Sequence, residues 1–114
     1  MAQMIPCGKE IIRINPQKNS IEYSTDGGHN WHQRYTYSYA GTFVDLILFG
    51  TEVIACTSKG IYFSKDKGCN WHSRYVGNSF GTFLQLMADG GMLLATTSKG
   101  LYYSKDSGMN WHKK

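Results

Sequence analysis

Three stretches of the chain decide its fold: STDGGHNWH at residues 24–32, SKDKGCNWH at residues 64–72 and SKDSGMNWH at residues 104–112. They share the pattern Ser-x-Asp-x-Gly-x-Asn-Trp-His at a constant spacing of 40 residues. The segments that start at Gly41 and Gly81 align without a gap to residue 114, and more than half of the aligned positions are identical. The first copy is looser, with two extra residues near positions 15–19. Such self-similarity indicates a repeat architecture.

Each copy of the repeat is expected to contain four short β-strands. Alternating or continuous apolar runs are separated by turn signals such as Asp89-Gly90-Gly91 and Ser98-Lys99-Gly100, and no helical period with caps is present. Four antiparallel strands per 40 residues or so are typical of a propeller blade. The sequence therefore predicts an all-β propeller in one domain, 1–114, of three blades at about 1–40, 41–80 and 81–114. The strands expected in the first and last copies are 4–5, 11–14, 21–24 and 31–35, and 82–87, 92–97, 101–104 and 110 onward.

The repeated turn resembles the Asp-box, the bacterial neuraminidase repeat of sialidase-type propellers. Three matches in register cover nearly the whole chain, each between the expected third and fourth strands of a blade. The physical chemistry of the residue types favours a structural role, because the carboxylate can accept hydrogen bonds from its own turn, the glycine allows a positive φ and the tryptophan can be buried between blades. The matching residues are Ser24, Asp26, Gly28 and Trp31; Ser64, Asp66, Gly68 and Trp71; and Ser104, Asp106, Gly108 and Trp111.

Three blades are too few to close a propeller, which needs about four to eight. Whole blades at both ends would leave two exposed faces, which we expect to be apolar and to need a cover. Two copies related by a two-fold axis would give six blades, the number that the resemblance implies, so a homodimer is the expected assembly. The alternative is that the chain is a segment of a longer propeller protein.

The loops opposite the Asp-box turns are the expected binding face. In an up-and-down blade, the turns after the second and fourth strands share one end, where lysine, tyrosine and asparagine side chains gather. This mixture suits a glycan or a protein ligand, although ordinary solvated loops with locally packed tyrosines are the favoured explanation. The candidate binding residues are Tyr35, Tyr37, Tyr39, Lys59, Asn78, Phe80 and Lys99.

Catalysis is not expected from these residues. The resemblance to sialidases implies three converging arginines, a tyrosine with a glutamate partner and an acid/base aspartate. The chain has only Arg13, Arg34 and Arg74, of which the last two follow equivalent Trp-His pairs, and no catalytic pattern is recognisable. We therefore predict a non-catalytic binding or assembly scaffold, with a sialidase-like glycoside hydrolase as the alternative.

Composition excludes several other classes. Aromatic residues are 14% of the chain and charged residues 18%, which argues against disorder, and no apolar run is long enough to span a membrane. The net charge of +4 comes from scattered lysines without a base-reading motif, so no nucleic-acid partner is expected. One histidine per blade, at His32, His72 and His112, cannot converge on a metal, and no cofactor is expected. Three cysteines without a pairing pattern and no visible signal peptide favour the cytoplasm.

Overall fold

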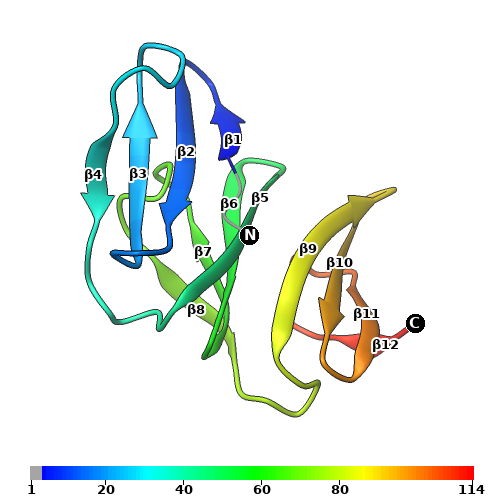
Figure 1. Cartoon of the computed structure of the whole chain (residues 1–114). Helices are drawn as coiled ribbons and strands as arrows, with labels where there is room; N and C mark the ends of the chain where they lie inside the picture. Colours follow the sequence, from blue (N-terminus) through cyan, green and yellow to red (C-terminus); the bar gives the residue numbers. More distant parts are fainter. Residues whose placement is uncertain (1–3) are drawn as a thin grey trace.

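The computed structural model describes residues 4–114, which form twelve β-strands in three separate antiparallel sheets (Figure 1). Within each sheet the strands follow chain order, so every neighbouring pair is a hairpin. We call the sheets blade 1 (β1–β4), blade 2 (β5–β8) and blade 3 (β9–β12). The predicted all-β class and the three four-stranded blades are confirmed. The strands are β1 (Met4–Cys7), β2 (Glu10–Asn15), β3 (Ser20–Ser24), β4 (His32–Tyr35), β5 (Phe43–Phe49), β6 (Glu52–Thr57), β7 (Gly60–Ser64), β8 (His72–Val76), β9 (Phe83–Asp89), β10 (Met92–Thr97), β11 (Gly100–Ser104) and β12 (His112–Lys113).

Strand boundaries differ from the sequence prediction by one or two residues at several ends. Asp89 belongs to β9, where it pairs with Met92, and the turn is made by Gly90 and Gly91 alone. The outer strands begin at the histidine of the repeat because the preceding tryptophan is held in the turn. Trp31 Nε1, for example, donates to the carbonyl oxygen of Gly28 at 3.0 Å. No helix in residues 4–114 has the length and apolar character needed to cross a membrane.

Both interfaces between blades are apolar, and a tryptophan from the repeated turn lies in each. At the interface of blades 1 and 2, the Trp71 ring lies 5.3 Å from the Phe43 ring and 6.4 Å from the Tyr35 ring, centroid to centroid. At the interface of blades 2 and 3, Trp111 belongs to one buried cluster with Ile54 and Ile61 of blade 2, and its ring lies 5.5 Å from the Phe83 ring. Each of these tryptophans is only 4% exposed. These two tryptophans are buried as predicted, whereas Trp31, for which the same burial was predicted, is only half-buried.

The same contact beside the turn glycine recurs at both interfaces. A Cβ atom added at Gly68 would lie 3.2 Å from Ile21 Cγ2 of the preceding blade, and one added at Gly108 would lie 3.0 Å from Ile61 Cγ2. Both isoleucines are fully buried. We call this isoleucine position in the third strand the knob, and the glycine and tryptophan of the next turn the socket. A side chain on the glycine would push the knob away by a few tenths of an ångström and would strain a backbone with a φ of 91° or 101°, so glycine suits this close packing.

Polar bridges also join consecutive blades. Arg34 of blade 1 donates to both carboxylate oxygens of Glu10, at 2.6 and 2.8 Å, and its Nη1 also donates to the Lys67 carbonyl in the turn of blade 2. Such bidentate pairs are stronger than neutral hydrogen bonds. Arg74 repeats these contacts one blade later, with Glu52 and with the Ser107 carbonyl.

Asp45 connects the inner strands of blades 2 and 3. It is 2% exposed, and its two carboxylate oxygens accept hydrogen bonds from the backbone amides of Leu46 and Leu86, each at 2.9 Å. Burial raises the pKa of this carboxyl group. The bridge fixes the position of β9 beside β5, because each oxygen is satisfied by a different blade.

The outer face of blade 1 is more polar than expected, which corrects the prediction of two apolar faces. Arg13 donates to Glu22 at 2.8 Å, and its guanidinium lies 3.9 Å from the centre of the Trp31 ring. Asn15 and Gln33 also donate to Glu22. Arg13 and Glu22 occupy the repeat positions held by Ala55 and Tyr62 in blade 2, and there those residues are buried against blade 1. The apolar remainder of the face is Met4, Pro6, Ile11 and Trp31.

Candidate binding face

The repeated turns are stabilising devices with almost identical geometry in the three blades. In blade 1, the Asp26 carboxylate accepts hydrogen bonds from the Asn30 amide at 2.9 Å, the Asn30 side chain at 2.6 Å and Ser24 Oγ at 2.7 Å. Ser24 Oγ in turn accepts the Gly28 amide at 2.9 Å, and Gly28 has a φ of 96°. Both carboxylate oxygens of Asp26 are thus hydrogen-bonded within its own turn. The equivalent bonds recur around Asp66 and Asp106.

Acid is expected to weaken these turns. The amide of Asn30 and the amide of Asn110 hold the pKa values of Asp26 and Asp106 at about 2, below their usual 3.8. A lowered folded-state pKa contributes stability that is complete above the unfolded value and is lost as pH falls through the folded value. The free energy of unfolding should therefore fall between about pH 4 and pH 2, measured by urea titration at each pH.

Two matched variants test this acid dependence. Asp106→Asn should flatten the slope of unfolding free energy against pH. Asp89→Asn, measured below the concentration at which copies associate, should not, because Asp89 is exposed and lies outside this network. The arginine-bonded Glu10 and Glu52 also have lowered pKa values and add to the wild-type slope. Asp45, whose pKa is raised by burial, opposes it. A wild-type slope unchanged by Asp106→Asn would contradict the proposed role of the turn carboxylate.

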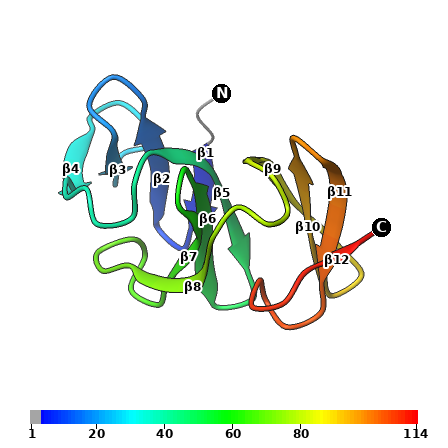
Figure 2. The same ribbon diagram turned by 90° about the horizontal axis from the view of Figure 1, so that it is seen from below.

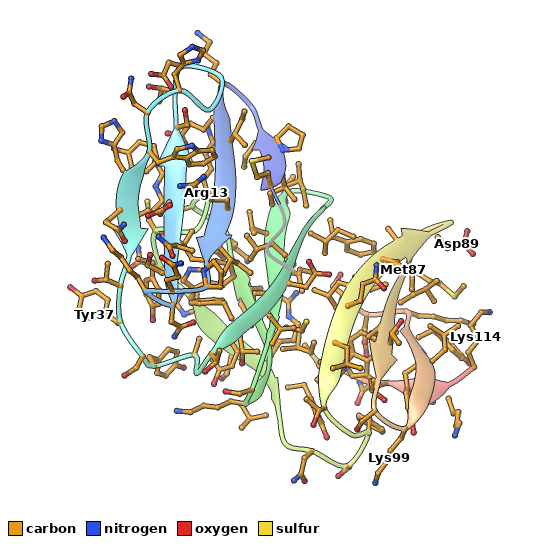
Figure 3. The ribbon with its side chains drawn as sticks, in the orientation of Figure 1. Arg13, Tyr37, Met87, Asp89, Lys99 and Lys114 are labelled. Atoms are coloured by element: carbon orange, nitrogen blue, oxygen red, sulfur yellow. The ribbon has the colours of Figure 1, made fainter. Side chains whose placement is uncertain are left out.

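The predicted binding residues lie at the end of the blades opposite the repeated turns. The connections from β4 to β5 and from β8 to β9 reach this end, as do the hairpin turns after β2, β6 and β10 (Figure 2). Tyr37 and Lys99 mark it in the side-chain view (Figure 3). The segments of this loop face are 15–20, 36–42, 57–60, 77–82 and 97–100, and none contains an aspartate or a glutamate. Their charges, from Lys18, Lys59 and Lys99, are all positive.

The structure divides the predicted binding residues into two groups. Tyr35 is 6% exposed and packs against Trp71, and Phe80 lies between the rings of Tyr75 and Tyr102 at 5.2 and 5.1 Å. These two residues pack within the protein, and burial raises the pKa of Tyr35. The exposed group is Tyr37, Tyr39, Lys59, Asn78 and Lys99.

The exposed tyrosines are positioned by neighbouring rings. Tyr37 is 70% exposed and lies edge-on to Tyr35, and Tyr39 is 53% exposed and lies edge-on to Tyr62. Lys59 Nζ donates to the Tyr39 carbonyl at 3.3 Å. The result is a pair of exposed phenol rings on packed supports beside an ammonium group. Such rings offer a large contact area together with hydrogen-bonding hydroxyl groups.

The hydrogen bonds of several polar residues on this face were not predicted from the sequence. Ser58 and Ser98 accept hydrogen bonds from the amides of Thr42 and Thr82, each at 2.9 Å, and so tie the turn after the second strand to the incoming connection. Asn19, with a φ of 51°, bonds the connection between β4 and β5. The repetition of Thr-Ser-Lys-Gly could have indicated the serine contacts, since both copies share it.

The recurring histidines do not converge. Each lies on the outer strand of its own blade beside an aromatic ring: His32 at 5.3 Å from Tyr23, His72 at 5.5 Å from Phe63 and His112 at 5.4 Å from Tyr103. Among residues 4–114, no group of three or more His, Cys, Asp and Glu side chains is arranged to hold a metal ion.

Comparison with solved structures identifies the architecture. The chain is 19% identical to Ycf48 from Cyanidioschyzon merolae, with a TM-score of 0.71 over 97% of this chain and 39% of that one. A structure described as Ycf48 bound to D1 peptide gives 19% identity and a TM-score of 0.72, over 98% and 43%. An ancestral GH74 enzyme gives 15% identity and a TM-score of 0.68, over 100% and 18%. The blades have a β-propeller fold.

These similarities establish the fold alone, because all identities are below one in five. No family model and no curated protein matches the chain. The chain spans about two fifths of the Ycf48 chains and less than one fifth of the GH74 chain. The three blades therefore match only part of each of these propellers.

Proposed function

We propose that the chain is a non-catalytic propeller scaffold that binds an extended acidic segment of a protein on its loop face. The observation that carries this proposal is the pair of exposed tyrosines, Tyr37 and Tyr39, beside Lys59 on a face without acidic residues. An acidic peptide complements the positive charge. The Ycf48 structure with a bound D1 peptide supports a peptide as the ligand class.

A glycosidase is less well supported. Glycoside hydrolysis normally requires two carboxyl groups flanking the bond, and the loop segments contain none. The three arginines are each paired with a glutamate, Arg13 with Glu22, Arg34 with Glu10 and Arg74 with Glu52, so they do not converge on one ligand. We propose that the repeated turns are Asp-boxes that stabilise the blades.

The assembly that we propose for this scaffold is a ring of six blades made by two copies of the chain. In the part of the chain that the structure describes, blades 1 and 3 each have one face that packs against no other blade (Figure 1). A second copy related by a two-fold axis would cover both faces at once.

Removing the exposed rings should abolish peptide binding without unfolding the scaffold. An array of fluorescently detected acidic, neutral and basic peptides would be probed with the wild type and with Tyr37→Ala/Tyr39→Ala. We expect acidic peptides to bind and the double variant to lose at least about tenfold in affinity, because two exposed anchor rings disappear. Met109→Ala, equally exposed but on a repeated turn, is the matched control.

Two results would contradict this proposal. One is a wild type that binds no peptide above the level of the basic set. The other is acidic-peptide binding that survives in the double variant. A glycan array run in parallel distinguishes a carbohydrate ligand from a peptide ligand. Binding to glycans without binding to peptides would show that the ligand is a carbohydrate.

A further inference from the structure

Among residues 4–114, one knob and one socket of the repeat are not filled by a neighbouring blade. Leu101 occupies the knob position of blade 3 and is 36% exposed, whereas the knobs Ile21 and Ile61 are fully buried. The socket of blade 1, at Gly28 and Trp31, is only half-buried, whereas the two filled sockets are buried. The unfilled socket is a hollow of about 510 Å³ that Met4, Ile11 and Arg13 also line.

We infer that Leu101 of one copy fills the Gly28–Trp31 socket of a second copy, so that blade 3 of each copy packs on blade 1 of the other. This inference rests on the proposed six-blade ring and names the contact that would close it. The occupant is a second copy because the chain itself carries the missing knob, in the register that fills the two internal sockets. Met4, Ile11 and Trp31 give the hollow an apolar wall for this side chain, beside the Arg13 guanidinium that lies over the Trp31 ring.

The two open faces also carry complementary polar residues, a carboxylate and an imidazole, in the same repeat register. In the interface of blades 2 and 3, Phe49 and Met109 line one hollow. The counterpart of Phe49 in blade 3 is Asp89, and the counterpart of Met109 in blade 1 is His29. The apolar pair of Phe49 and Met109 inside the chain is thus replaced by Asp89 and His29 at the face between copies. Both Asp89 and His29 are exposed in the single chain. Figure 3 shows Asp89 at the far end of β9.

The arginine bridge between consecutive blades also has a counterpart at the open face of blade 3. Lys114 occupies the position of Arg34 and Arg74, which donate to the Lys67 and Ser107 carbonyls of the following blade. Its Nζ lies 5.8 Å from the Tyr103 ring centre, on the same ring position over which the two arginines stack. The residue that corresponds to Lys67 and Ser107 in blade 1 is Gly27, which also has a positive φ. Its carbonyl is the acceptor that Lys114 would reach in the second copy.

Light scattering after size exclusion, combined with tryptophan emission, tests this contact. We expect the wild type to have twice the mass of the chain, and its emission to shift to the red on dilution as Trp31 becomes exposed. The shift should vanish in Trp31→Phe, because Trp71 and Trp111 are already buried within the chain. Leu101→Asp should raise the dissociation constant at least about 100-fold, because it places a charge in the socket. Val76→Asp, at another exposed apolar position, should leave it unchanged.

A charge exchange provides a rescue. Asp89→Lys should weaken the dimer, and Asp89→Lys/His29→Glu should restore it, which a general loss of folding would not do. A dimer that survives Leu101→Asp, or that forms without the Trp31 shift, overturns the contact. A wild type that stays monomeric at every concentration overturns the contact and the ring together. Peptide binding by that monomer would keep the scaffold function, so the failures are distinguishable.

Discussion

Gly60→Ala is expected to destabilise the chain by about 4 kcal/mol or more, which is in the exceptional range for a single substitution. Gly60 has a φ of 147°, and a Cβ atom there would lie 2.0 Å from the Tyr75 carbonyl oxygen. This oxygen belongs to the backbone of β8, which pairs with β7, so it cannot move without opening the hairpin. The loss should be measured as the shift in free energy of unfolding by urea titration.

Blade 3 supplies the matched control for this substitution. Gly100 occupies the same repeat position with a φ of 130°, but a Cβ atom there would meet only the flexible end of the Lys113 side chain, at 3.4 Å. Gly100→Ala should therefore cost only the backbone strain, about 1–3 kcal/mol. Equal losses in the two variants would contradict the steric argument, because strain from φ alone would then explain both.

The fold could be predicted because its signals are local and repeated. The turn that contains Asp66, Gly68 and Trp71 makes its hydrogen bonds within a few residues, so one short motif defines a complete hairpin end. Three copies at one spacing then place every other strand. The predicted strand boundaries were wrong by one or two residues where a side-chain hydrogen bond, such as that from Trp31 to the Gly28 carbonyl, holds a residue in the turn.

The contacts between blades could not be predicted in the same way. Asp45 bonds Leu86, 41 residues away, and its counterpart in blade 3 is a glutamine, so no repeat pattern marks the bridge. Arg34 donates to the Lys67 carbonyl of the next blade, 33 residues away. Such pairings depend on how the blades stack, which no local spacing encodes. These contacts exist only because the three sheets lie side by side.

The tyrosines of the loop face show a second limit of prediction from the sequence. Tyr35, Tyr37 and Tyr39 alternate in sequence, and strand periodicity would place all three on one side of a strand. The outer strand ends at Tyr35, however, so only this residue enters the core while the other two lie on the connection. The sequence therefore predicted the end of the blades at which these loops gather, and the role of this face in binding stays a prediction. The distinction between buried supports and exposed rings required the position at which β4 ends.

The interfaces between blades should dominate stability, and the tryptophans test this directly. Trp71→Ala is expected to cost about 3–5 kcal/mol, because it removes a fully packed ring between Tyr35 and Phe43. That is a large share of the about 5–15 kcal/mol typical of a folded domain. The free energy of unfolding should be measured by urea titration and circular dichroism.

Trp31→Ala is the internal comparison, because this ring has the same turn geometry but no preceding blade to pack against. Below the concentration at which copies associate, its loss should be roughly half that of Trp71→Ala or less, since less apolar area is buried. At high concentration the two losses should approach each other, because a second copy would then bury Trp31 as blade 1 buries Trp71. A Trp31→Ala loss that equals the Trp71→Ala loss at every concentration would mean that the turn itself, rather than packing between blades, is the source of the stability.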